Sequence, residues 1–148
     1  MLMPTRLGRT TVPVTASWST ALPPTFARIG ISRGPPRRQR GYRLYSPLAP
    51  GAWFNGVTPA EYLRLYMAQL AELDPHGVLA DLGDLAGGRV PALLCFEPPP
   101  PNSNWCHRGL VSAWFADTLG LRLVEYGYSA AGWGWTHPKL PADWRRSS

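Results

Sequence analysis

The chain has 148 residues, 45% of them hydrophobic, and a formal net charge of +6 at pH 7. This length suits one domain with a real core, and the composition excludes an intrinsically disordered chain. No apolar run approaches the length of a bilayer span, and Pro13 and Ser17 interrupt the residues that follow Arg6 and Arg9. We therefore expect neither a membrane segment nor a secretory signal. The expected location is cytoplasmic, where two cysteines are more often thiols or ligands than a disulfide.

The positive charge is concentrated in the first part of the chain. Residues 1–60 hold eight arginines and no acid, whereas residues 61–148 hold seven basic and nine acidic residues. An acid-free basic stretch attracts polyanions through its field and through bidentate arginine–phosphate pairing. At its centre is "SRGPPRRQRGYR", whose candidate nucleic-acid patch is Arg37, Arg38, Arg40 and Arg43. A solvated basic loop without a partner fits the same run equally well.

The first predicted elements follow a proline-rich start. Residues 1–24, with four prolines, indicate an extended N-terminal arm, which leaves 25–148 as the domain. The alternation in residues 25–32 predicts a strand, and a short strand is expected over 42–45. Thr58, Pro59 and Glu61 have the spacing of a capping box with proline at the first helical position. The helix that they open ends at Asp74-Pro75, where a second helix begins.

The second half alternates strands and helices. The run "RVPALLCFE" predicts a strand covered on both faces, followed by a helix over 105–119 and a strand over 121–126. This order is typical of a single α/β domain, with a small and mainly parallel sheet flanked by helices. The tail is rich in Trp, Gly and Pro and gives no clear element. Because ligands bind beyond the carboxyl ends of parallel strands, the exits at 32–36 and 95–108 are expected to share one crevice, with Trp53 and Phe54 as walls.

The loop between the last strand and helix carries the candidate chemistry. Asn102, Ser103 or Asn104 can each cap the helix. If Asn104 is the cap, Cys106 and His107 lie in the first turn, where free N–H groups stabilise a thiolate or a bound phosphate. Arg108 adds a forked donor for the same anion. The other candidate substrate-binding residues are Ser32, Arg33, Cys95 and Trp105.

The helical period gives His107 a direction. At about 100° per residue, His107 lies on the arc of Leu110 and Trp114, so it should point inward. A partner such as Glu97 or a backbone carbonyl would fix one tautomer, as in an orienting group or a base. The candidate catalytic residues are therefore Cys106, His107 and Glu97.

Four interpretations of this loop compete. In the simplest, Cys95 is a buried thiol and His107 a satisfied buried histidine; an anion-binding or catalytic site fits the cluster about equally well. Zinc comes third, because the loop offers at most three ligands, lacks paired C-x₂-C spacing and needs His76 or His137 for the rest. Zinc is thus a possible cofactor, but we assign no metal ligand. A disulfide comes last.

The pieces "ARIGIS", "LAPGAWF", "LLCFE" and "WCHRG", in this order, resemble the uncharacterised family called domain of unknown function four-eight-eight. The resemblance covers roughly residues 26–127. It implies a small α/β protein with motif positions at Cys95, Glu97, Cys106, His107 and Arg108. The family generally also has an Asp-x-Arg on an early strand, which this chain lacks because no acid precedes Glu61.

Two functions from different classes follow. The first is an enzyme acting on a nucleotide, a nucleobase or a nucleic acid, with the phosphate at the helix start beside Arg108. The second is a non-catalytic nucleic-acid-binding accessory protein that uses the basic run and the rings around Trp133 and Trp135; those rings fit a cover for the sheet edge at least as well. A small zinc-site protein is third. The expected partner is an anionic substrate, nucleotide or nucleic acid, and no membrane.

Overall fold

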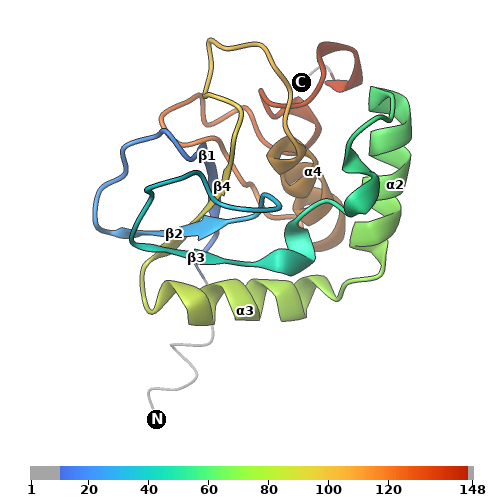
Figure 1. Cartoon of the computed structure of the whole chain (residues 1–148). Coiled ribbons are helices and arrows are strands. Elements are labelled where there is room, and N and C mark those ends of the chain that lie inside the picture. The colour runs from blue at the N-terminus through green and yellow to red at the C-terminus, as the bar shows by residue number, and fades with distance from the viewer. Residues whose placement is uncertain (1–10, 147–148) are drawn as a thin grey trace.

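Four strands form one sheet in the order β1-β4-β2-β3. Their bounds are Val14–Ser17 for β1, Phe26–Gly30 for β2, Tyr42–Leu44 for β3 and Val90–Cys95 for β4. The structure is a computed structural model, and it describes residues 11–146. All described strand pairs are parallel (Figure 1). The register places Gly30 opposite Leu94, so β2 and β4 end at the same edge. The predicted α/β fold with a parallel sheet is confirmed.

The two faces of the sheet have different covers. Leu93 of β4 belongs to the main core cluster with residues of the helices, whereas Ala92 and Leu94 face a smaller cluster around Trp18. All of β4 after Val90 is buried, as expected for an apolar run that is covered on both sides. Gly30 lies against the Trp18 ring, and a Cβ at this position would clash with it.

The described residues include three α-helices that contribute to the main core cluster with the sheet. They are α2 (Pro59–Ala71), α3 (Pro75–Ala86) and α4 (His107–Leu119). The capping box of α2 forms as predicted, because Glu61 N donates to Thr58 Oγ1 at 3.1 Å and Thr58 N donates to Glu61 Oε1 at 3.0 Å. In Figure 1, α3 runs below the sheet and α2 stands at its side. Between residues 11 and 146, no helix has the length and apolar character needed to cross a bilayer.

The predicted N-terminal arm is wrong over Val14–Ser17, which is strand β1 and pairs in parallel with residues 92–95 of β4. Its sequence hides this role, because the buried Thr15 and Ser17 break the alternation of apolar residues. The domain therefore includes β1 rather than starting at residue 25. Residues 1–10, with Arg6 and Arg9, lie outside the described part of the chain.

The segment predicted as a strand over 121–126 is extended but does not form a full strand. It contacts β1 through a bridge between Thr15 and Glu125, in which Tyr126 N donates to Thr15 O at 2.8 Å. The following residues pack on α4, because Gly134 N donates to Ser112 Oγ at 2.8 Å. Trp133 and Trp135 lie against arginines of the same chain. Trp135 Nε1 also donates to Asp117 Oδ2 of α4 at 3.0 Å, so this ring packs on a helix, whereas the sequence suggested the sheet edge.

Candidate functional site

A pocket of about 410 Å³ lies beyond the carboxyl ends of β2 and β4. The two exits that were predicted to share a crevice both contribute to it, so that prediction is confirmed. The loop from β4 to α4 rises along one edge of the molecule in Figure 1. The predicted site residues that line the pocket are Ser32, Arg33, Cys95, Glu97, Trp105, Cys106 and His107.

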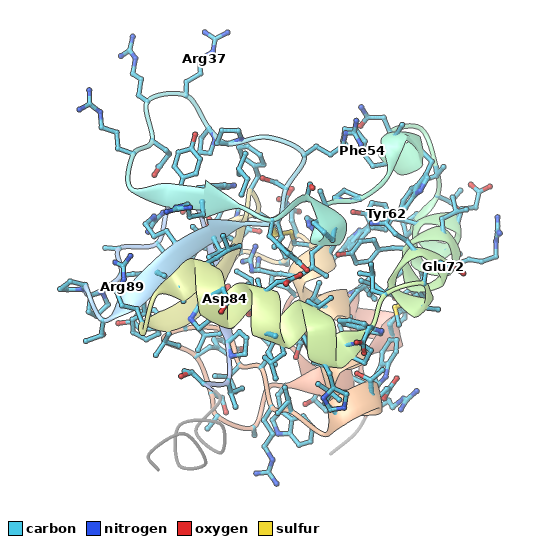
Figure 2. All side chains as sticks on the ribbon, turned by 90° about the horizontal axis from the view of Figure 1, so that it is seen from below. Arg37, Phe54, Tyr62, Glu72, Asp84 and Arg89 are labelled. Carbon is cyan, nitrogen blue, oxygen red and sulfur yellow. A yellow bond between two sulfur atoms is a disulfide. The ribbon has the colours of Figure 1, made fainter. Side chains whose placement is uncertain are left out.

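Aromatic rings form much of the wall. Phe54, from the 3-10 turn η2 (Ala52–Phe54), and Tyr62, from the first turn of α2, both line the pocket; Figure 2 shows the two labelled side chains on adjoining segments. The Tyr62 ring meets Trp105 edge to face with centroids 4.7 Å apart. Trp53 packs on Tyr62 at 4.9 Å and does not line the pocket. Sequence reasoning missed Tyr62, although it lies on the apolar stripe of α2.

Arg33 is the arginine of the pocket. Its guanidinium lies over the Phe54 ring, 5.3 Å from the centroid, and Nη1 donates to Pro50 O at 3.0 Å. The side chain is exposed, so its remaining N–H groups are open to solvent and to an anion. Ser32 is less available, because its hydroxyl donates to Gly34 O at 2.7 Å and accepts from Trp18 Nε1 at 3.0 Å.

The two cysteines form a disulfide, with the sulfurs 2.06 Å apart. This was the least expected of the four interpretations of the loop. The reason is geometric: β4 ends at Cys95, and the loop returns so that Cys106, just before α4, lies at the same edge of the sheet. Both residues are buried, and both line the pocket.

The start of α4 differs from the prediction. The helix begins at His107, and Cys106 is its extended N-cap (φ −147°, ψ 151°) without a side-chain cap bond. None of the three candidate caps takes that position, and Asn104 bonds within the loop, where its N–H donates to Asn102 Oδ1 at 3.0 Å. Cys106 N donates to Lys139 O at 2.9 Å. A backbone contact from the C-terminal segment, which sequence spacing does not reveal, therefore positions Cys106.

His107 points inward, as predicted. Its Nε2 donates to Ile31 O at 2.7 Å, which leaves Nδ1 as the acceptor nitrogen, 3.7 Å from Cys106 Sγ. The expectation of a backbone carbonyl partner is thus confirmed. Burial, reinforced by the positive charge of Arg108, lowers the pKa of His107 to about 4. The imidazole is therefore neutral at pH 7 and is a poor match for a general base, whose pKa should lie near the working pH.

The prediction that Arg108 holds the substrate anion is wrong. Arg108 is fully buried, and Nε and Nη2 donate to the two carboxylate oxygens of Glu125 at 2.9 and 2.7 Å. Nη1 lies 3.1 Å from Cys95 Sγ. A desolvated guanidinium requires a counter-charge, and Glu125 on the extended segment beside β1 supplies it. Arg108 therefore supports the site from behind and does not line the pocket.

Glu125 also connects to two polar residues that sequence reasoning did not place near the site. Thr15 Oγ1 donates to Glu125 Oε1 at 2.8 Å and accepts from His137 Nε2 at 2.7 Å, because His137 Nδ1 accepts from Lys139 N at 3.0 Å. His137, one of the two histidines that could complete a zinc site, is thus engaged away from the cysteines. The other such residue, His76, is exposed at the start of α3.

Lys139 holds the site loop in place. The residue is buried, and its Nζ donates to the carbonyls of Asn102 and Asn104 at 2.9 and 3.0 Å. Cys106 N in turn donates to the backbone carbonyl of Lys139, so these contacts attach the loop at three points. The C-terminal segment is therefore part of the site's scaffold.

The basic run lies apart from the pocket lining. Arg37, Arg38, Arg40 and Arg43 are exposed, on the loop before β3 and on β3 itself. Figure 2 shows Arg37 directed away from the body of the molecule. Both ion pairs found in residues 11–146 involve Glu125, so these four arginines have no acidic partner in that part of the chain.

The described residues therefore present one pocket that combines aromatic walls, an exposed arginine, a carboxylate, two sulfurs and an oriented imidazole. In comparisons with known proteins, no family model matches the chain, and neither does any curated protein or solved structure.

Proposed function

We propose that the protein is an enzyme that acts on a nucleotide or nucleobase bound in this pocket. The observation that carries the proposal is the lining itself, where Arg33, Glu97, Cys106 and His107 meet among aromatic rings. A volume of about 410 Å³ falls within the usual range of small-molecule sites, about 300–1,000 Å³. Sulfur, carboxylate and imidazole groups gathered at the carboxyl edge of a parallel sheet match the place where α/β enzymes bind their ligands.

Arg33 takes the anion-binding role that the sequence suggested for Arg108. Its guanidinium has one N–H bonded to Pro50 O and presents others at the pocket mouth, where they can pair with a phosphate. The rings of Phe54, Phe96 and Trp105 supply faces on which a base can stack. A substrate with an anionic group and a flat ring matches both features.

We also propose that the chain belongs to the family called domain of unknown function four-eight-eight. Four of the five motif positions, Cys95, Glu97, Cys106 and His107, line the pocket. The fifth, Arg108, donates to Cys95 from the core side. That arrangement supports a site shared with the family.

Binding of a mononucleotide tests the proposal directly. We expect adenosine or cytidine monophosphate to bind the reduced chain in calorimetry, and Arg33→Gln to weaken binding by about 10- to 100-fold, the range for loss of a hydrogen bond to a charged group. Arg43→Gln, an exposed arginine outside the lining, is the matched control and should bind as the wild type does. Absence of binding, or equal weakening by both variants, would contradict the proposal.

The unpaired basic run favours a second candidate, a nucleic-acid-binding accessory protein. Neutralising Arg37, Arg38, Arg40 and Arg43 together should then weaken binding of an oligonucleotide. The slope of log affinity against log salt should also fall by about one for each lost phosphate contact. An unchanged salt slope would exclude these arginines as the contact surface.

A further inference from the structure

We propose that the reduced protein binds a zinc ion through Cys95, Cys106 and His107. Each residue offers one ligand atom, and these three atoms lie within 4.8 Å of one another. All three side chains are buried. Two thiolates and an imidazole are the sulfur and nitrogen donors that zinc prefers.

The distances between the ligand atoms fit a tetrahedral ion. A Zn–S bond of about 2.3 Å and a Zn–N bond of about 2.0 Å place sulfur and nitrogen about 3.5 Å apart at a tetrahedral angle. Cys106 Sγ and His107 Nδ1 are 3.7 Å apart. The backbone turns from extended at Cys106 to helical at His107, which brings the side chains of these sequence neighbours together.

The backbone also leaves room between the two cysteines. Their Cα atoms are 7.3 Å apart, whereas a disulfide usually spans about 4.4–6.8 Å. Separation of the two sulfurs around an ion therefore needs no retreat of β4 from α4.

The neighbouring groups orient two of the three ligands. His107 donates its other ring N–H to Ile31 O, which is the second contact that metal-binding histidines almost always make. Arg108 Nη1 donates toward Cys95 Sγ at 3.1 Å, an interaction that stabilises the thiolate form. The charge of Arg108 is balanced by Glu125, so this donor does not leave an uncompensated cation beside the metal.

The disulfide and the zinc site are two states of the same residues. A dithiol reductant gives two electrons and two protons to the Cys95–Cys106 bond, which becomes two thiols while the reductant becomes a disulfide. Zinc then replaces one proton on each thiol. Oxidation therefore removes the site, and reduction creates it.

Three protein ligands leave a fourth position, and Cys95, Cys106 and His107 all face the pocket. An open position is the mark of a catalytic rather than a structural zinc. A water bound there becomes a nucleophile near neutral pH, and Glu97 lines the same pocket as a group that can accept its proton. The zinc site depends on ligand geometry alone; only the use of its water rests on the function proposed above.

Titration of the reduced, metal-free chain with Co²⁺ tests the site. We expect one equivalent to bind, with the thiolate charge-transfer and tetrahedral d–d bands that Co²⁺ shows in zinc sites, and zinc should displace it. Loss of a ligand should weaken Co²⁺ binding more than loss of a residue that only contacts a ligand, which typically costs about 10- to 100-fold. This applies to Cys95→Ser, Cys106→Ser and His107→Gln. His76→Gln, at an exposed histidine, should bind as the wild type does.

Absence of these bands from the Co²⁺ spectrum of the reduced wild type would overturn the proposal. An unchanged Co²⁺ spectrum in Cys106→Ser would do the same. If the ligand variants fail to fold, alkylation of the wild type decides the question: zinc should slow modification of both cysteines, and an equal rate with and without zinc would refute the site. Mononucleotide binding is measured on metal-free protein, so failure of that assay leaves the metal result standing, and the reverse also holds.

Discussion

Arg108 and Glu125 form a bidentate ion pair in which neither side chain is exposed. The two residues come from the first turn of α4 and from the extended segment beside β1. Their contact therefore joins the helix that begins at the pocket to the edge of the sheet. Burial alone would raise the pKa of Glu125, but the hydrogen bonds and charge of Arg108 hold it below its ordinary value.

Removal of the carboxylate should be costly. Glu125→Gln leaves the Arg108 guanidinium buried without a counter-charge, and we expect the free energy of unfolding to fall by about 3–5 kcal/mol. Urea denaturation followed by circular dichroism measures the change. Asp143→Asn, at an exposed acid, should stay within about 0.5 kcal/mol of the wild type. Similar losses in both variants would show that the pair has no special role.

His137 should make the protein sensitive to acid. Burial lowers its pKa from 6.5 to about 3, so the unfolded state binds the proton first as the pH falls below 6.5. Stability should decrease on this side, with a slope from this group of up to about 1.4 kcal/mol per pH unit. The charges that act on it, besides burial, are those of Glu125, Arg108, Arg145 and Lys139.

His137→Asn tests this contribution. The free energy of unfolding of the variant, measured by urea denaturation between about pH 7 and pH 5, should depend less steeply on pH than that of the wild type. Because Glu125 titrates below its ordinary 4.5, it contributes little in this range. Parallel curves for the two proteins would contradict the prediction.

Lys139 should control the order of the site loop. Lys139→Met removes the donors to Asn102 O and Asn104 O while it keeps the buried chain length. We expect faster amide exchange over residues 102–106 in hydrogen–deuterium exchange. Stability should fall by about 1–3 kcal/mol, because two part-buried carbonyls lose a charged donor. Arg89→Met, at an exposed site, is the control, and unchanged loop exchange in the Lys139 variant would exclude the anchoring role.

Two glycine substitutions should have opposite effects. A Cβ at Gly109 of α4 would lie 2.9 Å from Leu140 N and from the carbonyl carbon of Lys139, so Gly109→Ala should cost about 1–3 kcal/mol. Gly83 in α3 has open space at the same position, and Gly83→Ala should stabilise the chain by about 0.4–1 kcal/mol. Thermal unfolding separates the two outcomes, and equal effects would mean that the C-terminal segment does not press on α4.

The elements that local patterns determine were predictable. The Thr58–Glu61 capping box and the apolar run of β4 depend on neighbouring residues, and both formed as expected. Strand β1 was missed because Thr15 and Ser17 interrupt its apolar pattern. Only the pairing with β4, a distant part of the chain, makes this segment a strand. Local sequence cannot show that a distant strand has an open edge.

The candidate site divides in the same way. The parallel topology brought the exits of β2 and β4 into one pocket, as a general rule for such sheets predicts. The direction of Arg108 could not be predicted, because its partner lies 17 residues later and reaches it only through the tertiary fold. The same is true of Lys139, which is 35 residues from the Asn104 carbonyl that it holds.

The contacts from Lys139 to the start of α4 have a consequence for synthesis on the ribosome. The sheet strands, all three helices and both cysteines emerge before residue 139 does. The nascent chain can therefore build its scaffold early, while the loop that carries Cys106 gains its last anchors only after residue 139 has been made.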